Sequence, residues 1–168
     1  DGDFNVFNNG GPVVLTVAAN DQGRTGAPGA LSDSKVVPIT VNAINDDPII
    51  TAPAPTQASA LVVDEDTPVE FSALLNTEIR VDDPDQADTA GYFMDVAIVA
   101  NNGTFELSTT AGLSNVNGDG TGNLTFRGNV AAVNGALAGA VFTPTKDFNG
   151  PTTVQITVND RGNTGAGP

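Results

Sequence analysis

The fold is indicated most clearly by one stretch near the C-terminus, GPTTVQITVNDRGNTGA (Gly150–Ala166). Within it three β-branched apolar residues, Val154, Ile156 and Val158, alternate with polar ones, which is typical of a half-buried β-strand. The run of Asn, Asp and Gly that follows predicts a loop. This part of the chain is therefore expected to be a strand that ends in a polar loop.

The same phrase occurs near the N-terminus as GPVVLTVAANDQGRTGA (Gly11–Ala27), an offset of 139 from residue 11 to residue 150, without a gap. The triplet Asp3–Asn5 also recurs, as Asp147–Asn149. Repetition at a fixed period is the mark of a tandem array. We predict that residues 1–48 are the C-terminal part of a preceding repeat with its linker. Residues 49–168 are then a β-sandwich repeat that lacks its last strand.

Short segments rich in β-branched residues, bounded by Gly, Asn, Asp and Pro, predict strands along the whole chain. They are Val13–Ala19, Lys35–Ala43, Val69–Leu75, Tyr92–Ala100, Gly103–Ser108, Asn123–Gly128 and Thr152–Asn159. The segment Asn129–Gly139 differs, because its apolar residues recur at helical spacing. The pattern predicts an all-β, Greek-key immunoglobulin-like sandwich with one short helix.

Two strands cannot bury a core on their own, so the first 48 residues are expected to use a partner. We predict a strand exchange in which Lys35–Ala43 fills the vacant edge beside Thr152–Asn159. The exchange can be within the chain or with a neighbouring molecule. The stretch Ile49–Leu61 spans about 40 Å when extended, so the intramolecular route is physically open.

Composition excludes several classes of function. The chain has no Cys, His or Trp, only 5% aromatic residues, and a formal net charge of −14. The absence of His and Cys removes the usual general bases and nucleophiles, so we do not expect an enzyme. The negative charge excludes nucleic acid as a partner. No apolar run approaches the roughly 20 residues of a membrane span.

Of the 20 acidic residues 16 are Asp, and they are concentrated in four turn-like segments. These are Asn42–Pro48, Val63–Pro68, Val81–Asp88 and the two Asn-Asp turns at Asp21 and Asp160. Short carboxylates in turns, together with backbone carbonyls, supply the oxygens that calcium requires. Taken singly, each segment is equally consistent with an Asx-turn or a solvated hairpin end.

The stretch LTVAANDQGRTGAPGALSDSKVVPITVNAINDDPIIT (Leu15–Thr51) resembles the end of a cadherin repeat that runs into the next one. It has an alternating strand, an Ala-x-Asp, a Gly/Pro loop, a final strand and an Asx-rich linker. The Asp-Pro-Asp at Asp83–Asp85 matches the Asp-x-Asp loop of cadherins. With VDEDTPVEFS, AGAVFTPTKDFNG and ITVNDRGNTG, nearly the whole chain resembles the cadherin-like tandem repeats of large bacterial surface proteins and adhesins.

The resemblance implies calcium ions held at the junctions between domains. Carried over residue by residue, it gives the linker residues, the Asp-x-Asp loop and the Asp after the alternating strand as ligands. These are Asn45, Asp46, Asp47, Asp83, Asp85 and Asp160, with Asp21 belonging to the preceding repeat and Glu65 facing the following junction. Ala43 and Val158 depart from the family pattern, so one or two ions are expected.

The function that the resemblance implies is a calcium-stiffened extender module of an extracellular cell-surface adhesin, with neighbouring repeats of the same protein as partners. The alternative is a binding module whose loops recognise a host or surface glycan or a protein, including a second copy. The Gly-rich loop Asn115–Asn123 is either a further calcium site at Asp119 or a hairpin tip. Asp147 is expected to cap a turn, with Phe148 as a core anchor.

Overall fold

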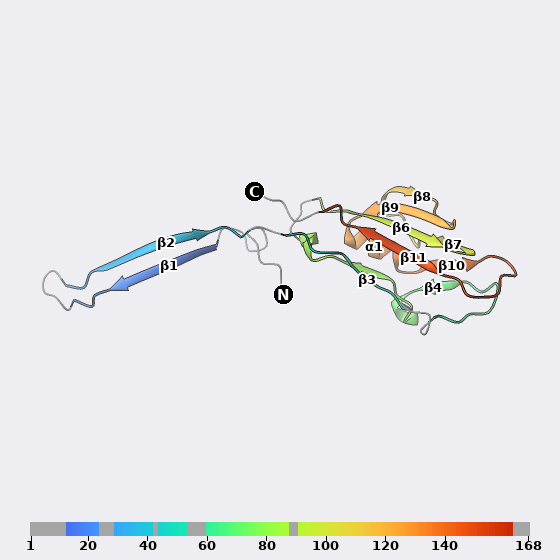
Figure 1. Ribbon diagram of the computed structural model, residues 1–168, viewed down its shortest axis with the longest axis horizontal. Helices are drawn as coiled ribbons and strands as arrows, with labels where there is room; N and C mark the ends of the chain where they lie inside the picture. The colour runs from blue at the N-terminus through green and yellow to red at the C-terminus, as the bar shows by residue number, and fades with distance from the viewer. Residues whose placement is uncertain (1–12, 24–28, 42–43, 54–59, 88–90, 163–168) are drawn as a thin grey trace.

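In the computed structural model the chain is mostly β-strand, arranged in several sheets, with one α-helix. The structure describes residues 13–23, 29–41, 44–53, 60–87 and 91–162. Figure 1 shows a hairpin at the N-terminal side and a group of sheets built from the rest of the chain. Among the described residues, no helix is both long enough and apolar enough to cross a membrane.

The largest sheet has four antiparallel strands in the order β11-β6-β9-β8. They are β11 (Val154–Asn159), β6 (Met94–Ala100), β9 (Asn123–Gly128) and β8 (Ser114–Asn117). Burial alternates along β6 and β9, as expected of strands that have one face on a core. β11 pairs with β6 from Val154 opposite Ala100 to Asn159 opposite Asp95, and lies at an end of the sheet.

Two smaller sheets complete this part of the chain. Three antiparallel strands follow the order β4-β10-β7, namely β4 (Val69–Phe71), β10 (Ala140–Pro144) and β7 (Gly103–Glu106). The two short strands β3 (Ile49–Thr51) and β5 (Arg80–Asp82) pair with each other. A 3₁₀ turn at Ala73–Leu75 follows β4, and a second one at Pro84–Ala87 follows β5.

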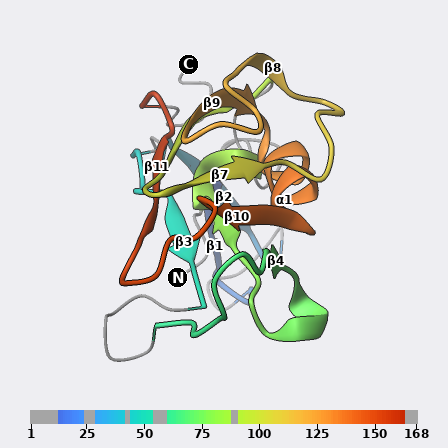
Figure 2. The same ribbon diagram turned by 90° about the vertical axis from the view of Figure 1, so that its right-hand side faces the viewer.

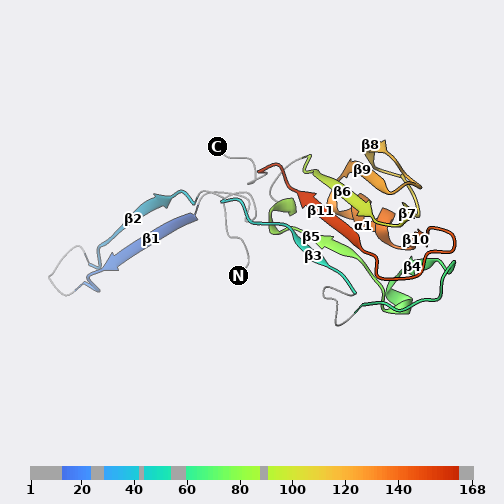
Figure 3. The ribbon, with the colours of Figure 1, turned by 45° about the vertical axis from the view of Figure 1, so that its right-hand side comes forward.

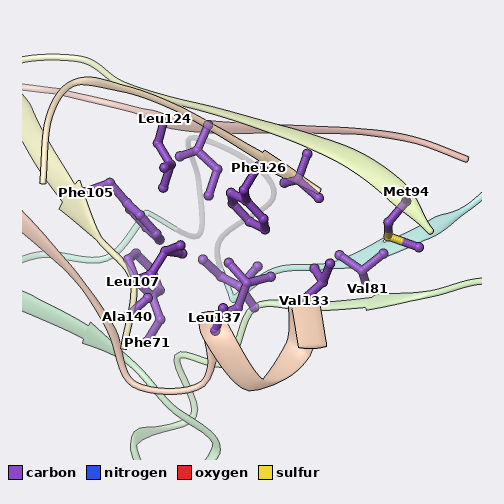
Figure 4. Packing of buried hydrophobic residues seen from close by; sticks show 14 of the residues in the cluster. Phe71, Val81, Met94, Phe105, Leu107, Leu124, Phe126, Val133, Leu137 and Ala140 are labelled. Atoms are coloured by element: carbon purple, nitrogen blue, oxygen red, sulfur yellow. The ribbon is translucent and has the colours of Figure 1, made fainter. Parts of the chain in front are cut away.

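The hydrophobic core lies between these sheets (Figure 4). Phe105 of β7 is fully buried and its ring stacks on that of Phe71, with 5.6 Å between the ring centroids. Leu124 and Phe126 of β9 reach the core from the four-stranded sheet. Burial of apolar side chains such as these is the dominant favourable term in folding.

The helix α1 (Val130–Leu137) is attached to the strands by polar side chains as well as by packing. Its N-cap, Asn129, accepts a hydrogen bond from the Ala132 N–H at 2.8 Å. The Asn134 side chain accepts from the Val81 N–H and donates to the Val81 carbonyl, both at 2.8 Å. This amide therefore holds the helix on β5, immediately before the loop that carries Asp83.

The hairpin consists of β1 (Val13–Asn20) and β2 (Ser32–Ile39), which pair with each other over their full length. It lies apart from the other sheets (Figure 1). Both faces of the hairpin are exposed, including six large apolar side chains. They are Val14, Leu15, Val17, Val36, Val37 and Ile39, each between 43% and 59% exposed.

The predictions of β1, β6, β7, β9, β11 and the short helix are confirmed, with bounds shifted by a few residues. The final strand of the first repeat was predicted over Lys35–Ala43, but it begins at Ser32 and ends at Ile39. The strand predicted over Val69–Leu75 stops at Phe71, where the 3₁₀ turn begins. The short strands β3, β5, β8 and β10 were not predicted. Phe148 is half-buried and does not belong to the core cluster, so its predicted role as a core anchor is wrong.

The intramolecular form of the predicted strand exchange is also wrong. β2 pairs with β1, and the only described partner of β11 is β6. The physical reason is the tether: Ile49–Thr51, which was expected to serve as a free linker, is itself paired with β5. Exchange between two molecules is not tested by a single chain, and Ala43 lies outside the described residues.

Candidate functional site

Three carboxylates are buried together at the end of the domain where β11 finishes. Asp83 and Asp85 lie in the loop after β5, and both are fully buried. Asp160 directly follows β11 and is 8% exposed. The buried Tyr92 lies close to all three. Its hydroxyl donates to Asp83 Oδ2 at 2.6 Å, and the negative charges of Asp83, Asp160 and Asp85 raise its pKa. Two segments far apart in the sequence thus bring three negative charges together.

The loop after β5 is ordered by its own backbone. The Asp85 N–H donates to Asp83 Oδ1 at 2.9 Å, and the Gln86 N–H donates to the Asp83 carbonyl at 3.4 Å. Pro84 between the two acids begins the 3₁₀ turn. This geometry holds both carboxylates inside the domain, where solvent cannot screen them.

The linker that precedes β3 contacts the same loop. The Asp46 N–H donates to Asp85 Oδ2 at 2.7 Å. The neighbouring Asn45 is half-buried, and its Oδ1 atom is buried with no hydrogen-bond partner. A buried amide oxygen without a donor is costly in a protein interior, unless a ligand or water completes its coordination.

The electrostatic effect of the cluster appears on Tyr92, the only tyrosine in the chain. Burial raises the pKa of its phenol well above the usual range. The hydrogen bond to Asp83 and the negative charges of Asp83, Asp160 and Asp85 raise this pKa further. The phenol therefore stays protonated and donates to the cluster.

A second group of charges supports the turn that carries Asp160. Asp95 on β6 accepts two hydrogen bonds from Arg127 of β9, at 2.6 and 3.0 Å, and one from Arg161 at 2.7 Å. The Arg127 guanidinium also lies 4.8 Å from the centroid of the Phe93 ring. Asp95 thus connects β9, β6 and the residue after Asp160.

The folded state should become less stable in acid, because the Asp95 carboxylate loses its ion pairs when it is protonated. The hydrogen bond from Arg127, followed by that from Arg161, lowers the pKa of Asp95 from 3.8 to about 2. The unfolded chain then binds the proton more tightly, so the stabilisation is present above pH 3.8 and is lost as the pH falls through about 2. Because Asp95 is 39% exposed, we expect a loss of about 1 kcal/mol or less.

Urea unfolding of the native chain and of Asp95→Asn across this pH range measures the effect as the difference between the two curves. Asp33→Asn is the matched control, because its ion pair with Lys35 is largely exposed. A pH dependence that is identical in the native chain and in Asp95→Asn contradicts the assignment.

The sequence repeat is also a structural repeat at the two Asn-Asp turns. Asn20 Oδ1 accepts from the Gln22 N–H at 2.7 Å, and Asn159 Oδ1 accepts from the Arg161 N–H at 2.8 Å. One residue later, Asp21 accepts from the Gly23 N–H at 3.0 Å and Asp160 from the Gly162 N–H at 3.1 Å. Both turns place their third and fourth residues at positive φ. The two copies therefore fold alike.

The two Asp residues differ in their surroundings. Asp21 is exposed at the tip of the hairpin, where its carboxylate also accepts from the Leu31 N–H at 2.8 Å. The hydrogen bond from Gly23, and then that from Leu31, lowers the pKa of Asp21. Only Asp160 lies with the buried carboxylates.

The other predicted ligands lie in three different places. Asp46 and Asp47 are exposed in the linker beside the cluster. Glu65 is exposed in a turn whose next residue, Asp66, accepts from the Asp147 N–H at 2.8 Å. That turn lies beside the β10–β11 loop, at the opposite end of β11 from Asp160. Asp119 accepts from the Leu107 N–H at 2.9 Å and so holds its loop onto the chain after β7.

The donor set of the cluster fits a hard cation. It consists of carboxylate and amide oxygens, which calcium prefers, and it includes the buried Asn45 Oδ1. Among the described residues, however, no three acidic side chains are already arranged around one point as ligands. A cation here would therefore require the carboxylates to turn toward it. A hollow of about 330 Å³ on the four-stranded sheet, beside Asp95 and Asn159, is lined by none of the three buried carboxylates.

Three residues of this region, Tyr92, Asp95 and Arg127, were not predicted from the sequence. The one available signal was that Tyr92 is the single tyrosine of a strongly acidic chain. No protein-family model matches the chain, and no curated protein or solved structure is significantly similar to it.

Proposed function

We propose that this chain is a calcium-binding structural module of an extracellular surface protein, built like a cadherin repeat and stiffened by calcium where the linker meets the sandwich. The observation that carries the proposal is the burial of Asp83, Asp85 and Asp160 in one place. Carboxylates that are buried close together repel one another, and a bound cation offsets this repulsion with the oxygen ligands that calcium prefers.

The linker supports the same function. The Asp46 N–H donates to Asp85, and Asn45, the residue before Asp46, has a buried Oδ1 atom without a hydrogen-bond partner. A cation bound by Asn45 together with the three buried carboxylates connects the linker to the loop after β5 and to the end of β11. Such a cross-link restricts the angle between the linker and the sandwich, as an extender module requires.

The strand order supports a Greek-key arrangement. β10 lies between β4 and β7, and β11 lies beside β6, so most neighbouring strands of these two sheets are distant in sequence, while β8 and β9 are consecutive. Strands connected in this way are typical of cadherin-like and immunoglobulin-like sandwiches. The alternative, a glycan- or protein-binding module, stays a prediction from the sequence.

Terbium luminescence tests the site directly. Terbium replaces calcium at oxygen sites and emits when a nearby tyrosine absorbs light, and the chain has one tyrosine and no tryptophan. We expect emission on excitation of Tyr92, displacement of terbium by calcium, and a higher unfolding temperature in calcium. Extracellular calcium modules have a Kd of about 0.1–1 mM, so about 1 mM calcium should stabilise the folded state by roughly 0.4–1.4 kcal/mol for each site.

Asp33→Asn is the control, because it removes an equal charge from the exposed hairpin, and it should bind terbium normally. Absence of tyrosine-sensitised emission together with an unfolding temperature unaffected by a chelator contradicts the proposed function. If the emission of the native chain is lost in Asp33→Asn, terbium is attracted generally to the acidic surface, and this result also contradicts the proposed function.

A further inference from the structure

The edge of β11 that faces away from β6 borders an apolar groove of about 550 Å³. Its lining includes Ile50 of β3, Leu61, Val69, Phe142 and the stretch Thr152–Ile156. Figure 2 shows β3 next to β11, and Figure 3 shows the same part of the molecule from a side that also displays β5. Among the described residues no strand pairs with this edge of β11. A groove beside an open strand edge is suited to an added strand.

The internal repeat indicates which strand fits. β1 is the sequence copy of β11, and the turns that follow the two strands make the same hydrogen bonds. The partner of β1 is β2, with Val36 opposite Thr16 and Val37 opposite Leu15. Moved by the repeat offset onto β11, this register places Val36 opposite Gln155 and Val37 opposite Val154.

In that register the apolar half of β2 falls on the groove. Val37 and Ile39 lie on the same strand face as Val154, which packs against the core, and they come opposite Val154 and Thr152. In the hairpin Val37 and Ile39 are 48% and 43% exposed, so insertion removes apolar surface from water. Lys35 comes opposite Ile156, at the end of the groove nearest Asp160, and Asp33 comes opposite Val158, which is not among the lining residues.

The β2 strand of the same chain cannot easily take this position. Ile39 would lie opposite Thr152, at the far end of β11 from Asp160, whereas Asp46 is hydrogen-bonded to Asp85 beside Asp160. The seven peptide steps from Ile39 to Asp46 span at most about 25 Å, and the eight steps from Thr152 to Asp160 measure about 26 Å. Even a fully extended linker barely covers the distance.

We propose that the open edge of β11 accepts strand β2 of a second copy of this chain, in the register that β2 has on β1. The donor strand leaves β1, and this costs little because an isolated two-stranded hairpin is only marginally stable in water. Exchange in both directions gives a two-fold dimer, and exchange in one direction gives an open chain of molecules. The proposal does not depend on calcium.

A disulfide lock tests whether β2 must leave β1. The native chain has no cysteine, so Thr16→Cys with Val36→Cys introduces one pair at directly opposed positions of the hairpin. Sedimentation velocity should show association of the native chain that increases with concentration. The oxidised variant should remain monomeric, and reduction should restore association.

Cross-linking between two variants tests the register. A mixture of Val36→Cys chains and Gln155→Cys chains should form a disulfide-linked species of twice the chain mass. The matched mixture of Val36→Cys with Thr157→Cys, two residues out of register on the same face, should form much less. Both acceptor positions are exposed, so these substitutions do not disturb the core.

Val37→Lys places a charge on the face that enters the groove, while the hairpin leaves that position half-exposed. It should weaken association at least about tenfold. The proposal is overturned by a native chain that is monomeric at every concentration reached, by association that persists in the oxidised lock, or by equal cross-linking at Gln155 and Thr157. Association that is the same with and without calcium does not bear on the proposed function, which is tested by terbium binding.

Discussion

The Asp85→Asn variant should be more stable than the native chain without calcium, and it should gain less stability from calcium than the native chain does. Asparagine keeps the size of the side chain and an oxygen that can accept from the Asp46 N–H. Without a cation, the substitution removes one of three buried like charges, which should stabilise the variant on the order of 1 kcal/mol. With calcium, it removes a charged ligand and should weaken affinity about tenfold or more.

Thermal or urea unfolding in chelator and in calcium measures the stability difference and the gain from calcium, and a calcium titration of Tyr92 fluorescence measures the affinity. Asp33→Asn should keep the calcium response of the native chain, because its carboxylate is exposed in the hairpin. A variant that is destabilised in chelator, or that binds calcium like the native chain, shows that Asp85 has a purely structural role.

The largest loss of stability is expected for Phe105→Ala. Phe105 is fully buried and stacks on Phe71, so the substitution removes apolar burial, an aromatic contact and the filling of the core. Truncations of this kind typically cost about 3–5 kcal/mol. Urea unfolding at neutral pH measures the difference in unfolding free energy between the variant and the native chain. The slope of this free energy against urea concentration should be the same for both proteins, because they expose the same surface on unfolding.

Leu74→Ala is the matched control, since Leu74 is a large apolar residue that is 95% exposed in the 3₁₀ turn after β4. Its effect should lie within about 0.5 kcal/mol. A cost below about 1 kcal/mol for Phe105→Ala would place the centre of the core elsewhere.

The sequence predicted the elements whose own residues carry a complete signal. β11 alternates Val154, Ile156 and Val158 with polar residues, and the structure has it as a half-buried strand over these positions. The helix was predicted from apolar residues at helical spacing, and Val133 and Leu137 are fully buried in it. In these elements the local pattern and the tertiary packing agree, so a short window of sequence is sufficient.

The missed strands depend on contacts that a local window does not contain. β5 has a single apolar residue, Val81, between Arg80 and Asp82, and three residues cannot show a period. It is a strand because β3 pairs with it and because Asn134 bonds both backbone groups of Val81. β2 begins earlier than predicted, because pairing with β1 extends the strand through the polar residues Ser32–Ser34.

The acidic residues of the candidate site were predicted from the sequence, but the residues that support them were not. Asp83, Asp85 and Asp160 were named together by the resemblance, and the structure places all three around Tyr92. Glu65 and Asp21 lie elsewhere, and nothing in the sequence alone gave the burial of each acid. The contacts of Asp95 with Arg127 and Arg161 join two strands and the turn after β11, so they follow from sheet order and could not be predicted from spacing.

The hydrogen bond between Asp46 and Asp85 also determines how the domain meets mechanical tension. A pull transmitted along the linker reaches this bond before it reaches β3, whose ladder with β5 is only three residues long. Alone, that short ladder is a weak anchor under load. Any cross-link at the linker carries the force past it, into the loop after β5 and the end of β11, so the resistance of the domain to stretching is set at its entrance rather than in its core.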